Sequence, residues 1–204
     1  MKQISINEKS VSFTDIVAEN KDIIYTVLLY ISGLLIGSIL FKGLNEETRN
    51  AIKSFLEIGG TDFKNMLINR AAYYLIIFVV CLALGFSAIG FPLLSLIPTA
   101  LGAITGLKIA YYYISLGLKG FGYSSLLITP QAALFITVIV FTVRSCKKLS
   151  RGILQNSIKK ADMAQELSLA SYLKQFGVLF LILILIILIN TLTVSSFSPL
   201  IKLG

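Results

Sequence analysis

The chain has 204 residues, of which 56% are hydrophobic and 14% charged, with a mean hydropathy of +0.85 and a net charge of +8. Soluble domains carry about 25% charged residues, so this composition excludes an ordinary water-soluble globule. It indicates one integral membrane domain over residues 1–204.

Four runs without any charged side chain predict where the chain crosses the membrane: residues 23–41, 71–107, 120–143 and 175–201. As one helix the second run would be about 55 Å long, well beyond the ~30 Å hydrocarbon core of a bilayer. It must therefore fold back, and Gly85, Gly90, Pro92 and Pro98 supply the break. The prediction is an all-α, polytopic protein with about five transmembrane helices, at residues 23–41, 71–85, 93–112, 126–143 and 176–192.

Residues 1–22 are mostly polar and include four acids, unlike the short basic start of a signal peptide, so we expect the first helix to be a retained anchor. In that helix Gly33 and Gly37 form a Gly-x-x-x-Gly pair, a spacing that lets another backbone approach closely. Gly102, Gly106 and Ala110 repeat the pattern in the third helix. We expect these five small residues to pack helices, within the bundle or against partner helices.

Residues 44–70 form an amphipathic segment of mixed charge that Gly59 and Gly60 divide into two short helices. We expect both to lie on the membrane surface or to dock a partner protein. The predicted contact residues are Phe55, Leu56, Phe63 and Met66.

Lys108 is the one charge that falls inside a predicted helix. Three tyrosines follow at positions 111–113, and tyrosine is typical of the membrane interface. We therefore expect Lys108 to lie near the helix end and to anchor it by extending to the interface.

A basic loop at residues 144–174 is predicted to be cytoplasmic, with an amphipathic surface helix at 153–172. Basic residues next to a transmembrane end are retained inside and attract anionic lipids, so we expect lipid and not nucleic acid as the partner of this charge. Alternation then places the N-terminus inside, residues 44–70 and 117–123 outside, and the C-terminus outside. The loop residues proposed to carry this role are Arg144, Lys147, Lys148, Arg151, Lys159 and Lys160.

The composition argues against enzymatic activity. The chain has no histidine and no carboxylate between Asp62 and Asp162, which excludes Ser–His proteases, His-ligated zinc sites and carboxylate relays within the helices. A Ser–Lys pair is the one catalytic option left, and no spacing singles out a nucleophile. We expect no catalytic residue, no metal and no cofactor.

Several glycine- and proline-containing patterns resemble the stage II sporulation protein M family. They are residues 85–93 (GFSAIGFPL) with the glycine stripe that follows, residues 117–120 (GLKG), residues 126–130 (LLITP) and residues 143–145 (VRS). The resemblance covers about residues 23–151.

The resemblance implies a non-enzymatic scaffold in the septal or mother-cell membrane of a spore-forming bacterium. Such a scaffold holds peptidoglycan hydrolases of the engulfment machinery, and a homo-oligomer is compatible with it. The alternative is a permease subunit whose ATPase is a separate chain; its polar pathway would have to use Ser95, Thr105, Thr129, Gln131 and Asn190.

Overall fold

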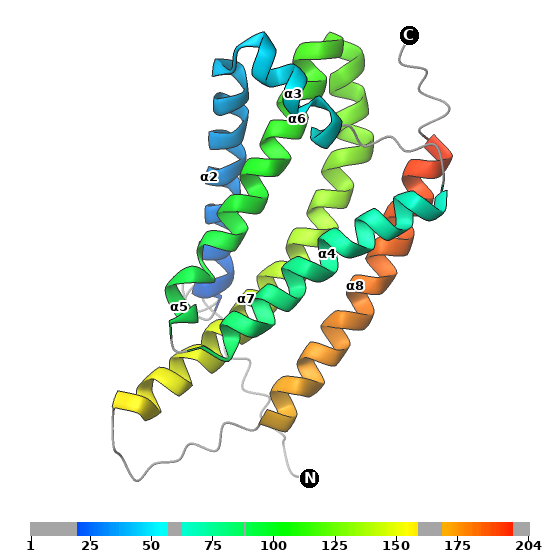
Figure 1. The fold of residues 1–204 in the computed structure, drawn as a ribbon. Helices are drawn as coiled ribbons and strands as arrows, with labels where there is room; N and C mark the ends of the chain where they lie inside the picture. Colours follow the sequence, from blue (N-terminus) through cyan, green and yellow to red (C-terminus); the bar gives the residue numbers. More distant parts are fainter. Residues whose placement is uncertain (1–19, 57–62, 88, 159–168, 198–204) are drawn as a thin grey trace, which may run out of the picture.

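The computed structural model describes residues 20–56, 63–87, 89–158 and 169–197, and within these ranges it contains helices and no strand (Figure 1). The elements in chain order are α2 (Lys21–Gly43), α3 (Glu46–Leu56), α4 (Phe63–Gly85), α5 (Gly90–Leu93), α6 (Leu96–Tyr123), the π-helical η1 (Ser124–Ile128), α7 (Thr129–Ile158) and α8 (Leu169–Phe197). The predicted all-α class is confirmed.

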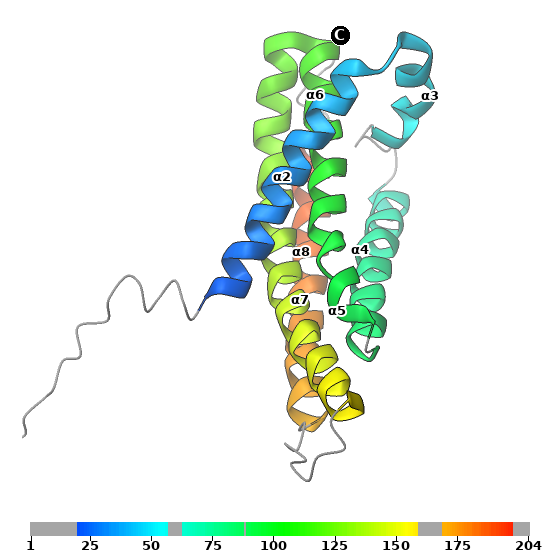
Figure 2. The same ribbon diagram turned by 90° about the vertical axis from the view of Figure 1, so that its left-hand side faces the viewer.

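Five long helices lie side by side, with α2 packed along α6, and α4, α7 and α8 beside them (Figures 1 and 2). Among the described residues, four stretches are long and apolar enough to cross a membrane, and one of them is the 65-residue stretch Gly90–Leu154. That stretch doubles back, because α6 rises through the bundle and α7 returns beside it (Figure 1). The helices therefore pass through the bundle five times.

Gly117 lies close to the reversal between α6 and α7. Its backbone has φ 57° and ψ −132°, outside the helical region and in a part of φ/ψ space that side chains with a Cβ rarely adopt. A glycine at this position lets the end of α6 bend, and η1 then leads into α7.

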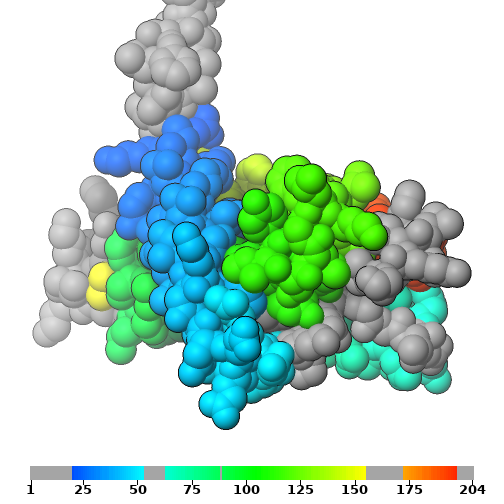
Figure 3. Space-filling view, turned by 90° about the horizontal axis from the view of Figure 1, so that it is seen from above, coloured from blue at the N-terminus to red at the C-terminus, as the bar shows by residue number. Residues whose placement is uncertain are grey.

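The bundle has two distinct ends. At the basic end, lowest in Figure 1, α2 begins, α7 ends and α8 begins. At the far end lie α3, the reversal between α6 and α7, and the end of α8 (Figure 1). Figure 3 looks onto the far end and shows α3 on the surface beside α6.

Two groups of buried apolar side chains hold the helices together. The larger joins α4, α7 and α8 through residues such as Phe78, Ile139 and Leu183. The smaller, here called the far-end cluster, consists of Phe41, Met66, Tyr111, Tyr112, Tyr123, Leu127, Ile128 and Val194. Many large apolar side chains of α2, α4 and α8 remain exposed, which suits lipid as the surrounding solvent.

The third predicted span is too short, since regular helix continues past residue 112 to the break at Gly117. Lys108 consequently lies nine residues before that break and not at the end of the helix. Its Nζ is 5.9 Å from the centroid of the Tyr73 ring on α4, so the side chain points toward a neighbouring helix. The prediction that Lys108 anchors a helix end is wrong, because the tyrosines that follow it do not mark where the helix breaks.

The boundaries of the extramembrane segments also differ from the prediction. Residues 63–70 belong to α4 and do not form a separate surface helix. Residues 144–158 continue α7, so the first half of the predicted basic loop is helical. Residues 169–172 of the predicted surface helix belong to α8, and residues 159–168 lie outside the described part of the chain.

Candidate functional site

The contact between α2 and α6 is built on four glycines that lie where the two backbones touch. A Cβ on Gly33 would collide with the carbonyl oxygen of Thr99, and one on Gly37 with that of Ala103. Helix α6 has two such glycines of its own. A Cβ on Gly102 would collide with the carbonyl oxygen of Tyr30, and one on Gly106 with that of Leu34.

The two helices run in the same direction, because residues further along α2 meet residues further along α6 (Figure 1). The Ser38 hydroxyl donates across the contact to the carbonyl oxygen of Gly106 at 3.3 Å. Further toward the far end the Phe41 and Tyr111 rings meet edge to face with centroids 6.0 Å apart. Ala110 is half-buried beside the far-end cluster.

Each glycine pair is thus covered by the other helix of the same chain. Small residues allow close backbone approach, which is how helices associate where lipid removes the hydrophobic driving force between them. The faces of Gly33, Gly37, Gly102 and Gly106 are therefore not open to helices of a partner protein.

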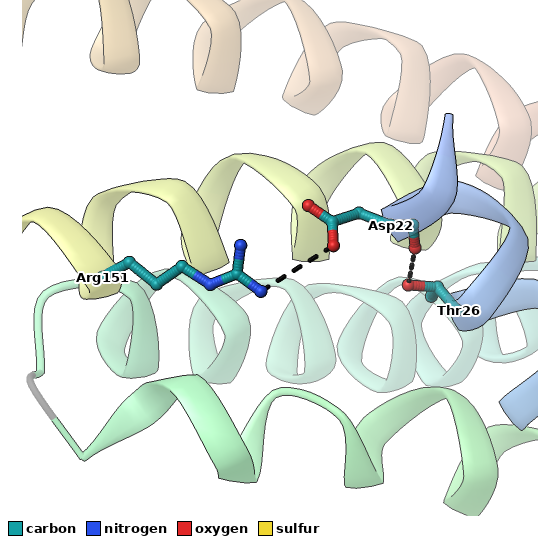
Figure 4. A network of polar contacts seen from close by, with 3 residues as sticks. All are labelled: Asp22, Thr26 and Arg151. Atoms are coloured by element: carbon teal, nitrogen blue, oxygen red, sulfur yellow. Dashed lines mark hydrogen bonds and ion pairs between the residues drawn. The ribbon is translucent and has the colours of Figure 1, made fainter. Parts of the chain in front are cut away.

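Basic residues of α7 contact α2 and α5 at the basic end. The Arg151 guanidinium forms an ion pair with the Asp22 carboxylate at 3.8 Å, and the Asp22 carbonyl oxygen accepts a 2.7 Å hydrogen bond from Thr26 (Figure 4). Both ion-pair partners are partly exposed, so the pair contributes roughly 0–1 kcal/mol.

Two aromatic contacts accompany this ion pair. The guanidinium carbon of Arg151 lies 4.4 Å from the centroid of the Phe91 ring on α5, and Lys147 Nζ lies 5.2 Å from that of Tyr25 on α2. A cation–π contact contributes about 0.5–1 kcal/mol at an exposed site, which applies to the partly exposed Arg151. The start of α2 is thereby held against the end of α7.

The basic residues predicted to form one loop therefore differ in their surroundings. Lys147 is 3% exposed and packs inside the protein, Arg144 is half-buried, and Lys148 is exposed. Lys159 and Lys160 lie outside the described residues. In the described part of the chain, the exposed basic surface is therefore smaller than predicted.

Helix α3 turns its apolar side inward and its acidic side outward. Ile52 packs against the far-end cluster. The Arg49 guanidinium carbon lies 5.4 Å from the centroid of the Phe41 ring. Arg49 Nη2 donates a 3.0 Å hydrogen bond to the Lys42 carbonyl oxygen. Glu46 and Glu47 are exposed at the first turn, where the positive end of the helix dipole stabilises carboxylates.

The predicted apolar contact residues do not form one exposed surface. Met66 is 8% exposed and belongs to the far-end cluster, so it is a core residue and its assignment as a surface contact is wrong. Phe63 is exposed at the start of α4. The side chains of Phe55 and Leu56 lie outside what the structure describes, although their backbone belongs to α3.

The family model of stage II sporulation protein M matches residues 26–199, from the first turns of α2 through the end of α8. The chain belongs to the stage II sporulation protein M family. It is accordingly a membrane protein of sporulation, and the family is not a known enzyme family. No curated protein and no solved structure matches the chain.

Sequence reasoning missed the contacts that hold the basic end of this family member. Asp22, Tyr25 and Phe91 do not stand out, because each is a common residue type in its surroundings. The sequence contains one signal for the ion pair. Few acids lie between Asp22 and Arg151, so few carboxylates are available to pair with a basic residue near a helix end.

Proposed function

We propose that this protein is a non-enzymatic scaffold that holds peptidoglycan-processing partners at the septal membrane during engulfment. The observation that carries the proposal is the family match, which spans the complete helical bundle and not an isolated segment. The lack of histidine throughout the chain and of carboxylates in α4, α6, α7 and α8 supports a role without acid–base chemistry.

The shape of the far end supports contact with partners on that side. Glu46 and Glu47 of α3 are exposed there, as are Leu118, 86% exposed, and Phe121 near the reversal between α6 and α7. A surface that combines charged and apolar side chains is suited to bind a protein domain lying above the membrane.

The charges indicate the orientation on which this role depends. Arg144, Lys148, Arg151 and Lys174 lie toward the basic end, and none of the described residues of α7 or α8 is acidic. The positive-inside rule then puts the basic end in the cytoplasm. The N-terminus is cytoplasmic in this proposal, and the far end and the C-terminus lie outside, on the side of the cell wall.

Reversing the charge of α3 tests the scaffold. In sporulating cells of the native host, a tagged chain carrying Glu46→Lys and Glu47→Lys is expected to lose most of the peptidoglycan hydrolase that co-purifies with the unaltered chain. Membrane migration around the forespore, followed by fluorescence microscopy, should slow in parallel.

Lys148→Glu is the control, because it reverses a charge that is also exposed but lies at the basic end, on the other side of the proposed membrane. The variant should retain the hydrolase. If the unaltered chain retains no peptidoglycan hydrolase, or the α3 variant retains as much as the control, the proposed role is wrong.

A further inference from the structure

One guanidinium lies in a part of the bundle whose described residues include no acid. Helices α4, α6, α7 and α8 have no aspartate or glutamate in their described residues, yet Arg70 of α4 is half-buried among them. Charged groups at membrane depth are costly unless opposite charge compensates them.

All hydrogen-bond acceptors that the structure gives Arg70 are neutral. Its Nη1 donates to Gln131 Oε1 of α7 at 3.1 Å and to the carbonyl oxygen of Asn190 of α8 at 3.4 Å. The buried Asn190 amide in turn donates to the Tyr74 hydroxyl at 3.4 Å. These contacts orient the guanidinium, and among the described residues none of them brings a negative charge to it.

The orientation of Gln131 follows from its contact with Arg70. A guanidinium can only donate, so the glutamine must present its amide oxygen to Arg70 and direct its NH₂ group elsewhere. Gln131 is 8% exposed, and its Nε2 has no hydrogen-bond partner in the described structure. A buried donor left in this way costs about 1–3 kcal/mol.

The cluster lies toward the far end of the bundle. Arg70 is seven residues from the start of α4, and Asn190 is seven residues from the end of α8. Seven helical residues correspond to about 10 Å along the axis, so both residues lie within about 10 Å of the ends of their helices.

We propose that Arg70 and Gln131 form a binding site for a phosphate group. Phosphate oxygens would accept from the Arg70 guanidinium and from the Gln131 amide. A guanidinium suits this ligand because its planar donors match phosphate oxygens. The phosphate is either the headgroup of an anionic lipid or a free ion.

The test measures the melting temperature of the full chain in detergent, with phosphatidylglycerol, phosphatidylcholine or inorganic phosphate added at constant ionic strength. If only phosphatidylglycerol raises the melting temperature, the ligand is the lipid headgroup. If inorganic phosphate raises the melting temperature, the ligand is the free ion. If none of the three raises it, or phosphatidylcholine does so as strongly as phosphatidylglycerol, the proposal is wrong.

Gln131→Glu is the decisive variant, since it places a carboxylate beside Arg70 in the position of the amide. It should melt at a higher temperature than the unaltered chain without ligand, and its affinity for the phosphate probe should fall at least tenfold. Lys64→Gln is the matched control: it removes an exposed charge from the same end of α4 and should leave the affinity unchanged. Equal affinity in Gln131→Glu and the unaltered chain would overturn the site.

Discussion

At Gly106 the backbones of α6 and α2 are so close that a side chain has no room. Replacing this glycine with leucine would push atoms into the Leu34 carbonyl group, which cannot move without separating the helices. Overpacking commonly costs about 1–3 kcal/mol, and collision with backbone should reach the upper end of that range. We expect Gly106→Leu to lower the melting temperature in detergent by at least about 5 °C.

Gly177→Leu provides the comparison for this variant. Gly177 lies on the exposed side of α8, and a Cβ added there would meet no atom within 4 Å, so the same substitution should change the melting temperature little. Similar melting temperatures for Gly106→Leu and the unaltered chain would mean that α2 and α6 do not pack as described.

The spacing of the glycines predicted which residues of α2 and α6 pack closely, but not what they pack against. A Gly-x-x-x-Gly pair states only that some backbone can approach. Gly33 and Gly37 meet the Thr99–Ala103 side of α6 because α2 and α6 run parallel, although α3, α4 and α5 lie between them in the chain. The sequence contains no local signal for that pairing.

Among the elements, the apolar runs located all five long helices and failed at their ends. A run without charge marks the part of a helix that lipid surrounds. The helix itself can continue beyond that run, because charged side chains that find partners are compatible with helical backbone hydrogen bonds. Helix α7 shows this clearly, because Lys147 and Arg151 contact Tyr25, Asp22 and Phe91 and so allow the helix to extend beyond Val143.

A proline substitution at position 148 tests whether the chain forms a helix or a loop there. Lys148 is exposed, so Lys148→Ala should be nearly neutral. Lys148→Pro removes a hydrogen bond of the helix interior and should cost ~3 kcal/mol or more. Thermal unfolding of both variants in detergent measures the difference. Equal stability of the two would indicate that residues 144–158 are not helical.

For the whole molecule, the sequence predicted an odd number of passes, and the five long helices follow that course. The polar cluster around Arg70 lay beyond prediction. Gln131 and Asn190 stand out in the sequence as isolated polar residues, but their meeting with Arg70 depends on the packing of α4, α7 and α8. Contacts among three helices that are distant in sequence leave no periodicity to recognise.

Site-specific labelling in intact cells tests the orientation of the whole bundle. Both native cysteines, Cys81 and Cys146, are buried and free, so a membrane-impermeant maleimide should react mainly with an introduced thiol. Glu47→Cys on α3 should be labelled from outside the cell, whereas Lys148→Cys near the end of α7 should be labelled only after permeabilisation. The opposite pattern would show that the protein has the reverse orientation in the membrane. Labelling of both introduced cysteines from outside would contradict a bundle whose two ends lie on opposite sides of the membrane.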